Sequence, residues 1–173
     1  NMSVQDAKGI LIGGDTAATD YFRRATSDQL TQKFLPIVTQ AITHGLALAG
    51  ELFVDPGDGI LLPDKFWENY RLLYEVKLGA RLTTFPFYAG RGFDTRGFAQ
   101  ALSSAGREKL VVLLNFPNNP TGYVPTPSEA AAIVAALLRQ AQAGTKLVVL
   151  IDDAYFGLFY HLGGRSLTES LFG

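Results

Sequence analysis

Short apolar runs alternate with longer stretches of helical spacing through most of this chain. Runs of aliphatic and β-branched residues are typical of strands in parallel sheets, and they lie at residues 60–62, 81–87, 110–114 and 147–151. Stretches of helical length lie between them, at residues 65–77, 95–104 and 127–143. Strands that alternate with helices predict an α/β domain with a mainly parallel sheet, flanked by helices and connected by right-handed crossovers.

Residues with strong local preferences mark the ends of several elements. Thr126 suits the N-cap of the last helix, Pro127 its first position and Glu129 its first turn, where a negative charge is favourable. Gly144 suits the C-terminal end of the same helix. Asp, Pro and Gly gather at residues 55–59 and predict a turn there.

The beginning of the chain has a weaker pattern. Residues 1–26 are rich in Gly, Ala and Asp with little periodicity. We treat residues 1–36 as an N-terminal segment ahead of a large domain at residues 37–173. Residues 27–30 favour a short helix and residues 36–39 a short strand. Residues 45–54 are apolar almost all round, which predicts a helix buried on every side.

Composition excludes several functional classes. Of 173 residues, 47% are hydrophobic and 18% are charged, which indicates a folded globular chain. The net charge of −1 and the lack of a basic block argue against a nucleic-acid partner or an anionic membrane surface. The absence of cysteine excludes disulfides and Cys-ligated zinc, and neither a signal peptide nor a bilayer-spanning stretch is predicted. We expect a cytoplasmic protein without a metal site.

Two polar motifs follow two of the predicted strands. Residues 115–122 read Asn-Phe-Pro-Asn-Asn-Pro-Thr-Gly, and residues 152–155 read Asp-Asp-Ala-Tyr. Taken alone, the first is a good turn sequence, and a carboxylate at a strand end often caps a backbone amide. Ligands of parallel sheets bind at the carboxyl ends of the strands. The two motifs together therefore place an amide, a carboxylate and a phenol where a ligand would bind.

The two motifs resemble those of the class I/II aminotransferases, which are fold-type-I enzymes dependent on pyridoxal 5′-phosphate (PLP). The similarity runs from about residue 37 to residue 172 and implies an incomplete large domain of that fold. It implies that Asp152 pairs with the protonated ring nitrogen, where a carboxylate keeps the nitrogen cationic. It also implies that Asn119 and Tyr155 hydrogen-bond the 3-oxygen of the ring. Asp153 is the less suitable acid, because neighbouring strand residues point to opposite faces.

The resemblance also implies an aromatic residue stacked on the cofactor ring. Trp67, in Phe66-Trp67-Glu68-Asn69-Tyr70, has the matching position, and it is the only tryptophan of the chain. Phe66 or Tyr70 would take this role if the register differed. The simplest alternative for Trp67 is an anchor in the core.

The cofactor phosphate is expected at Thr43-His44-Gly45, ahead of the helix predicted at residues 45–54. The Thr43 hydroxyl and the amides of His44 and Gly45 would bind it, because unpaired amides at a helix N-terminus favour an anion. The alternative is a capping loop with a surface histidine. The family also often has a cis bond at the position of Asn119-Pro120, where the proline makes cis accessible.

The Schiff-base lysine of the family lies beyond the second motif, and the chain has no lysine after Lys146. The arginine that binds the substrate carboxylate has no counterpart either. We therefore interpret the chain as part of a PLP-dependent aminotransferase, usually a homodimer, that acts on an amino acid and a 2-oxo acid. By itself it should bind the cofactor weakly and be inactive.

Other interpretations stay open. Asp152, Asn119 and Tyr155 define the cofactor and not the reaction, so another fold-type-I enzyme, such as a C–S lyase or a decarboxylase, fits the same residues. A non-catalytic PLP-binding module fits them too. A nucleotide site is disfavoured, because the sequence lacks a Gly-x-x-x-x-Gly-Lys-Ser/Thr loop.

Overall fold

The computed structural model describes residues 40–105 and 108–156, together with residues 5, 9, 12, 17 and 37. The chain divides into two compact units, Asn1–His44 and Gly45–Gly173. The helix predicted at residues 27–30 lies outside the described residues. In the strand predicted at residues 36–39, only Ile37 is described, and it is helical, which contradicts a strand at that position.

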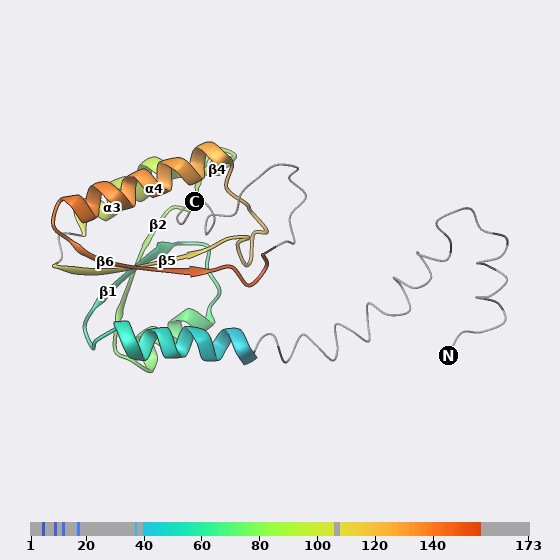
Figure 1. The fold of residues 1–173 in the computed structure, drawn as a ribbon, viewed down its shortest axis with the longest axis horizontal. Helices are drawn as coiled ribbons and strands as arrows, with labels where there is room; N and C mark the ends of the chain where they lie inside the picture. Colours follow the sequence, from blue (N-terminus) through green and yellow to red (C-terminus); the bar gives the residue numbers. More distant parts are fainter. Residues whose placement is uncertain are drawn as a thin grey trace. The chain divides into compact units, whose positions relative to one another are not determined.

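A parallel four-stranded sheet forms the centre of the second unit (Figure 1). Its strands are β1 (Gly59–Pro63), β2 (Arg81–Phe85), β5 (Lys109–Asn115) and β6 (Lys146–Asp152), in the order β2-β1-β5-β6. Every neighbouring pair is parallel, and Asn115 of β5 stands opposite Asp152 of β6. The predicted α/β class with a mainly parallel sheet is confirmed.

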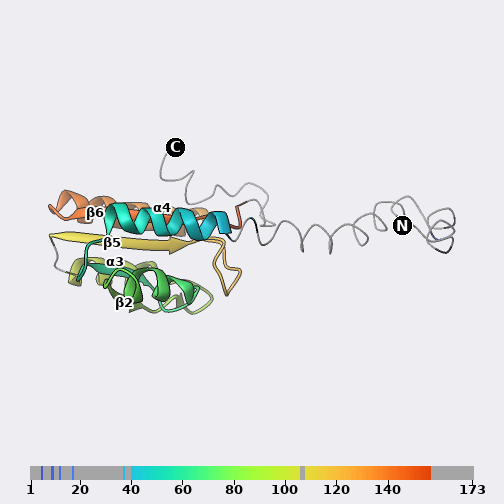
Figure 2. The same cartoon turned by 90° about the horizontal axis from the view of Figure 1, so that it is seen from below.

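Helices cover both faces of this sheet (Figure 1). On one face lie α3 (Thr95–Ser104) and α4 (Pro127–Gln142). On the other lie residues 45–53, the end of a helix at residues 40–53, and the π-helix η1 (Arg71–Val76). In both views the axis of α4 and that of the helical residues 45–53 run roughly along β5 and β6 (Figure 2).

The predicted ends of α4 are confirmed. The Thr126 side chain accepts a hydrogen bond from the Glu129 amide, and the Glu129 carboxylate accepts one from the Thr126 amide, which together form a capping box. Gly144 follows the helix with φ +98°. This left-handed conformation is one that glycine adopts without steric cost.

An aromatic cluster fills the space between the sheet and the helices α3 and α4. Its five phenylalanines are buried, and their rings meet edge to face or tilted; they are Phe85, Phe87, Phe93, Phe98 and Phe116. Phe116 directly follows β5 and Phe87 lies just beyond β2. The same apolar core therefore supports the loops at the carboxyl ends of the strands.

The helix predicted to be buried on every side has instead one buried and one exposed side. Leu46, Gly50 and Val54 are buried at intervals of four residues, while Leu48 is 57% and Leu52 65% exposed. The prediction was wrong because this helix forms an outer layer among the described residues, so only one of its apolar sides meets the sheet.

The helix predicted at residues 65–77 is shorter and differently wound. Helical structure begins only at residue 69 and continues as η1, where the Lys77 amide donates to the Leu72 carbonyl five residues earlier. The wider turn buries Tyr70 and Tyr74 together beneath the sheet. Apolar spacing alone did not distinguish this winding from an α-helix.

A small hairpin was not predicted. β3 (Tyr88–Ala89) pairs antiparallel with β4 (Gly92–Phe93), and Gly90 in the turn has φ +67°. The Phe93 amide donates to Glu129 Oε1 at 2.8 Å, which attaches the hairpin to the start of α4. The Gly-Arg-Gly sequence at residues 90–92 was the available signal for this turn.

Candidate functional site

The carboxyl ends of the four strands are joined by hydrogen bonds between side chains and backbone. Each bond links the end of one strand to the end of its neighbour in the sheet. The three bonds are from Phe87 N to Asp64 Oδ1 at 2.9 Å, from Asn118 Nδ2 to Lys65 O at 3.1 Å, and from Asn115 Nδ2 to Asp152 O at 2.8 Å. We call this set the edge network. It connects strand ends that are far apart in sequence.

Asp152 ends β6 with its side chain inside the protein, only 7% exposed. Its Oδ2 accepts a hydrogen bond from the Tyr70 hydroxyl at 2.5 Å, and its Oδ1 accepts one from the Ala154 amide at 3.1 Å. Asp153 is half-buried. A buried carboxylate held at both oxygens is a fixed acceptor for a cationic N–H group.

Tyr70 is the residue of this site whose role the sequence did not predict. Burial raises the pKa of its phenol well above the ordinary value, and the negative charge of Asp152 raises it further. The hydroxyl therefore keeps its proton and remains a donor to the carboxylate. Tyr70 had been considered only as an alternative ring-stacking residue, and no sequence signal identified its partner 82 positions away.

Trp67 is half-buried and packs edge-on against Tyr70, with ring centroids 5.6 Å apart and planes at 87°. The other two candidates for ring stacking are engaged elsewhere. Phe66 lies beneath the Arg71 guanidinium, 5.6 Å from the ring centroid, and Tyr70 is fully buried. Phe66 and Trp67 are both partly accessible, and Trp67 is the one that contacts Tyr70, the hydrogen-bond partner of Asp152.

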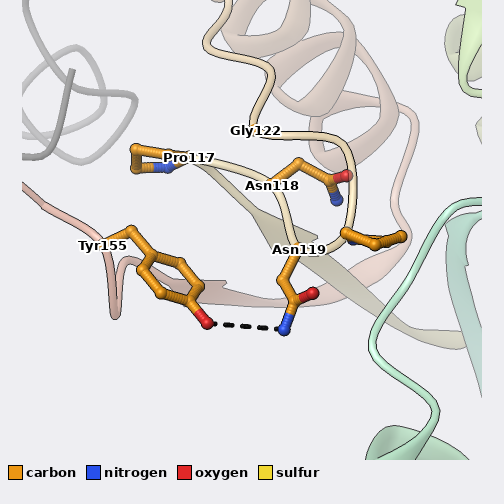
Figure 3. Close-up of a pocket in the computed structure, with 6 residues that line it drawn as sticks. Pro117, Asn118, Asn119, Gly122 and Tyr155 are labelled. Atoms are coloured by element: carbon orange, nitrogen blue, oxygen red, sulfur yellow. Dashed lines mark hydrogen bonds between the residues drawn. The ribbon is translucent and has the colours of Figure 1, made fainter. Parts of the chain in front are cut away.

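Asn119 and Tyr155, which the family resemblance assigns to one ligand atom, lie next to each other; their role stays a prediction. Asn119 Nδ2 lies 3.4 Å from the Tyr155 hydroxyl, and the polar ends of the two side chains meet in Figure 3. They line a cavity of about 260 Å³ together with Pro117, Asn118, Pro120 and Gly122. Both groups are N–H or O–H donors and Tyr155 is 38% exposed, so an incoming oxygen could reach both.

The loop that carries Asn119 is held from within. Asn118 is buried, and its Oδ1 accepts hydrogen bonds from the Thr121 amide at 3.2 Å and the Thr121 hydroxyl at 2.6 Å. The Gly122 amide donates to the Asn118 carbonyl at 2.7 Å. The expected cis bond at Asn119-Pro120 is present, and Phe116-Pro117 is also cis.

Thr43, His44 and Gly45 lie inside the helix at residues 40–53 and not in a loop before it. Inside a helix, the amides of His44 and Gly45 have the carbonyls four residues earlier as partners. The expected unpaired amides are therefore missing at these two positions, because the helix begins farther towards the N-terminus than its apolar pattern indicated. The phosphate role of these residues stays a prediction.

Within residues 40–105 and 108–156 and the five single described positions, no group of three or more His, Asp or Glu residues is placed to hold a metal ion. The same residues include no helix with the length and hydropathy needed to cross a membrane.

The chain is similar to curated aminotransferases. It is 32% identical over 127 residues to the probable N-succinyldiaminopimelate aminotransferase DapC of Mycobacterium tuberculosis (strain ATCC 25618 / H37Rv). The aligned region covers 72% of this chain and 30% of that protein. It is 30% identical over 124 residues to an aspartate aminotransferase of Musicola paradisiaca (strain Ech703). This aligned region covers 72% of the chain and 29% of the relative. The chain thus spans about 30% of the length of these relatives.

Solved structures share the fold. The structure of the N-succinyldiaminopimelate aminotransferase from Mycobacterium tuberculosis superposes with a TM-score of 0.57 and is 29% identical in sequence. The match covers 72% of this chain and 31% of that protein's chain. An alanine aminotransferase from Pyrococcus furiosus superposes with a TM-score of 0.60, over 73% of this chain and 30% of that protein's chain. At 20% sequence identity, this match concerns the fold alone. The parallel sheet and its helices therefore correspond to part of an aminotransferase large domain.

A different family model, described as a protein of unknown function (DUF4197), matches residues 1–49. This match includes Thr43, His44 and Gly45 and ends within the helix at residues 40–53. The residues of the edge network all lie beyond it.

Proposed function

The chain belongs to the class I/II aminotransferases, and we propose that the carboxyl edge of its sheet holds PLP for transamination between an amino acid and a 2-oxo acid. The single observation that carries the proposal is the buried carboxylate of Asp152, fixed at both oxygens at the end of β6.

Asp152 fits the ring nitrogen of the cofactor. A carboxylate that is shielded from water interacts strongly with a cationic partner and favours its protonated form. Each of its oxygens accepts one hydrogen bond in the described structure, and a carboxylate oxygen has room for a second. Asp152 therefore has the charge and the accepting capacity to keep a pyridine nitrogen protonated.

Asn119 and Tyr155 fit an anionic ring oxygen. Their donors lie 3.4 Å apart, close enough to share one acceptor. Two neutral donors lower the free energy of an oxyanion without adding a charge to the site. Trp67 supplies the half-buried aromatic surface proposed to face the ring.

PLP, when bound, supplies an electron-accepting ring for carbanion chemistry at the substrate. The residues described here contribute binding and electrostatics: Asp152 holds a proton on the ring nitrogen, Tyr70 holds Asp152, and Asn119 with Tyr155 holds the ring oxygen. A homodimer and a cytoplasmic location complete the proposal; the homodimer rests on the family resemblance, and the location rests on the composition of the sequence.

A binding titration tests the cofactor part of this proposal. Pyridoxine 5′-phosphate is the suitable probe, because it has the ring, the 3-hydroxyl and the phosphate but no aldehyde to react with the six lysines. The fluorescence of Trp67, the only tryptophan, reports on the same region. We expect saturable binding that weakens at least about tenfold in Asp152→Asn, because the charged acceptor is lost. Equal binding by the chain and this variant would contradict the proposal.

The reaction class is tested with PLP itself and an amino acid. Any product formed faster than with free PLP should be the corresponding 2-oxo acid. An eliminated or decarboxylated product would reassign the chain to the lyases or decarboxylases.

A further inference from the structure

Asn115 is a buried amide at the last position of β5, with only 3% of its surface exposed. It stands directly opposite Asp152 in the register of β5 and β6. Each buried polar group costs free energy unless it is fully hydrogen-bonded. The partners of Asn115 therefore indicate what the amide does.

Both ends of the Asn115 amide are used. Its Nδ2 donates to the Asp152 carbonyl at 2.8 Å, and its Oδ1 accepts from the Asn119 amide at 2.6 Å. One partner belongs to the residue proposed to pair with the ring nitrogen, and the other to the residue proposed to bind the ring oxygen. One side chain thus connects the two parts of the site through their backbones.

Only an amide satisfies both partners. A carboxylate of the same shape could accept from Asn119 but would turn an oxygen toward the Asp152 carbonyl. An apolar side chain would leave the part-buried Asn119 amide without this acceptor, whereas the Asp152 carbonyl would keep a bond from the Phe116 amide at 3.2 Å. Asn118, the other buried amide of the loop, reaches Lys65 and Thr121 and neither of the two cofactor residues.

We propose that Asn115 is a positioning residue that fixes the separation of Asn119 and Asp152, so that the ring nitrogen and the ring oxygen of one cofactor are bound together. This inference rests on the proposed function. Asn115 does not touch the cofactor; it acts through the backbone atoms of the two residues that do.

The first measurement needs no ligand. In the full chain, the Asn119 amide should be protected from hydrogen exchange, and in Asn115→Leu it should exchange at least about tenfold faster, because its acceptor is gone. Asn115→Asp should keep most of this protection. Equal protection in the chain and in Asn115→Leu would overturn the inference.

The second measurement uses pyridoxine 5′-phosphate. We expect about tenfold weaker binding to Asn115→Leu and an intermediate loss for Asn115→Asp. The absorbance of the bound probe should also shift from the ionised toward the neutral 3-hydroxyl form, because Asn119 no longer lies in place. In the Asn119→Ala background, Asn115→Leu should cost clearly less, since two residues that act through one contact are not additive.

A matched control separates positioning from lost stability. Ile133 is buried in the core on α4. Of the variants Ile133→Val and Ile133→Ala, the control is the one whose free energy of unfolding is closest to that of Asn115→Leu. The control should leave probe affinity and absorbance unchanged. If Asn115→Leu behaved like the control, Asn115 would be structural only. If the unsubstituted chain failed to bind the probe, the proposed function would be overturned, and the exchange measurement would still decide whether Asn115 holds Asn119.

Discussion

The Tyr70 hydroxyl donates a 2.5 Å hydrogen bond to Oδ2 of Asp152, and both side chains are buried. The bond joins the residue before η1 to the last residue of β6. Hydrogen bonds to a charged acceptor are stronger than neutral ones, particularly away from water. The direction of the Asp152 carboxylate therefore depends on a tyrosine in a different part of the sequence.

Tyr70→Phe should weaken binding of pyridoxine 5′-phosphate by about tenfold. The substitution keeps the ring but removes the donor, so the carboxylate loses one of its two bonds, and bonds to charged groups contribute about 1.5–3 kcal/mol. Titration of Trp67 fluorescence measures the change. Tyr74→Phe is the matched control, because Tyr74 donates to the Leu46 carbonyl at 3.0 Å and not to Asp152. A similar loss of affinity in both variants would argue against a specific role of Tyr70.

The free energy of unfolding should fall as the pH rises above about 10. Burial raises the pKa of Tyr70 above its ordinary value of 10.0, and the charge of Asp152 raises it further. Burial also raises the pKa of Tyr74. A folded-state pKa above the unfolded one means stability that is complete below pH 10 and is lost as the pH rises. Urea unfolding between pH 8 and pH 11 should show a shallower decline in Tyr70→Phe; an equally steep one would contradict the assignment.

Glu129→Gln should cost stability at neutral pH and less in acid. Burial by itself would raise the pKa of Glu129, but hydrogen bonds from the Thr126 amide and hydroxyl, from Tyr123 and from the Phe93 amide outweigh it, and the pKa lies below its ordinary value of 4.5. The contribution is therefore present above pH 4.5 and is lost as the pH falls through the lowered pKa. Urea midpoints of the two proteins should converge between pH 5 and pH 3. A constant difference would show that the charge is not involved.

The same carboxylate raises the pKa of Tyr123 to about 12, after the larger effect of burial. In Glu129→Gln this phenol should titrate at lower pH, which absorbance difference spectra can follow against Tyr123→Phe. An unchanged titration would place the cause of the shift in burial alone.

Two glycines of one helix should respond in opposite directions to alanine. At Gly50, a Cβ would lie 2.7 Å from Leu78 Cδ1 and 2.9 Å from Tyr74 Cε1, so Gly50→Ala should destabilise by about 1–3 kcal/mol. At Gly45 nothing lies within 4 Å of a Cβ, so Gly45→Ala should stabilise by about 0.5–1 kcal/mol through helix propensity. Thermal or urea unfolding distinguishes the two. Stabilisation by Gly50→Ala would mean that Tyr74 is not packed against this helix.

Elements with strong local signals could be predicted from the sequence. α3 has the predicted bounds, and α4 begins at the predicted Thr126 cap, because capping and turn preferences act within a few residues. The parallel sheet followed from the alternation of strands and helices. The winding of η1 and the one-sided burial of residues 45–53 could not be predicted, because both depend on which neighbours each face meets.

In the candidate site, too, the features with a local sequence signal could be predicted and those that depend on tertiary contacts could not. The motifs around Asn119 and Asp152 were visible as polar residues after apolar strands, and Asn119 and Tyr155 do lie together. The Tyr70 bond to Asp152 could not be predicted, because nothing local in Asn69-Tyr70-Arg71 shows which strand its hydroxyl reaches. Both partners of Asn115 likewise depend on the register of β5 against β6 and on the path of the loop after β5.

The edge network also bears on the order in which the chain can fold. Its three bonds join residues 23, 53 and 37 positions apart, so none can form until the corresponding loop has closed and two strands have paired. A synthetic peptide of residues 109–126 would contain the whole Asn-Pro motif yet lack its geometry. The binding surface should therefore appear only in the last, cooperative stage of folding, and recovery of probe binding during refolding should lag behind helix formation.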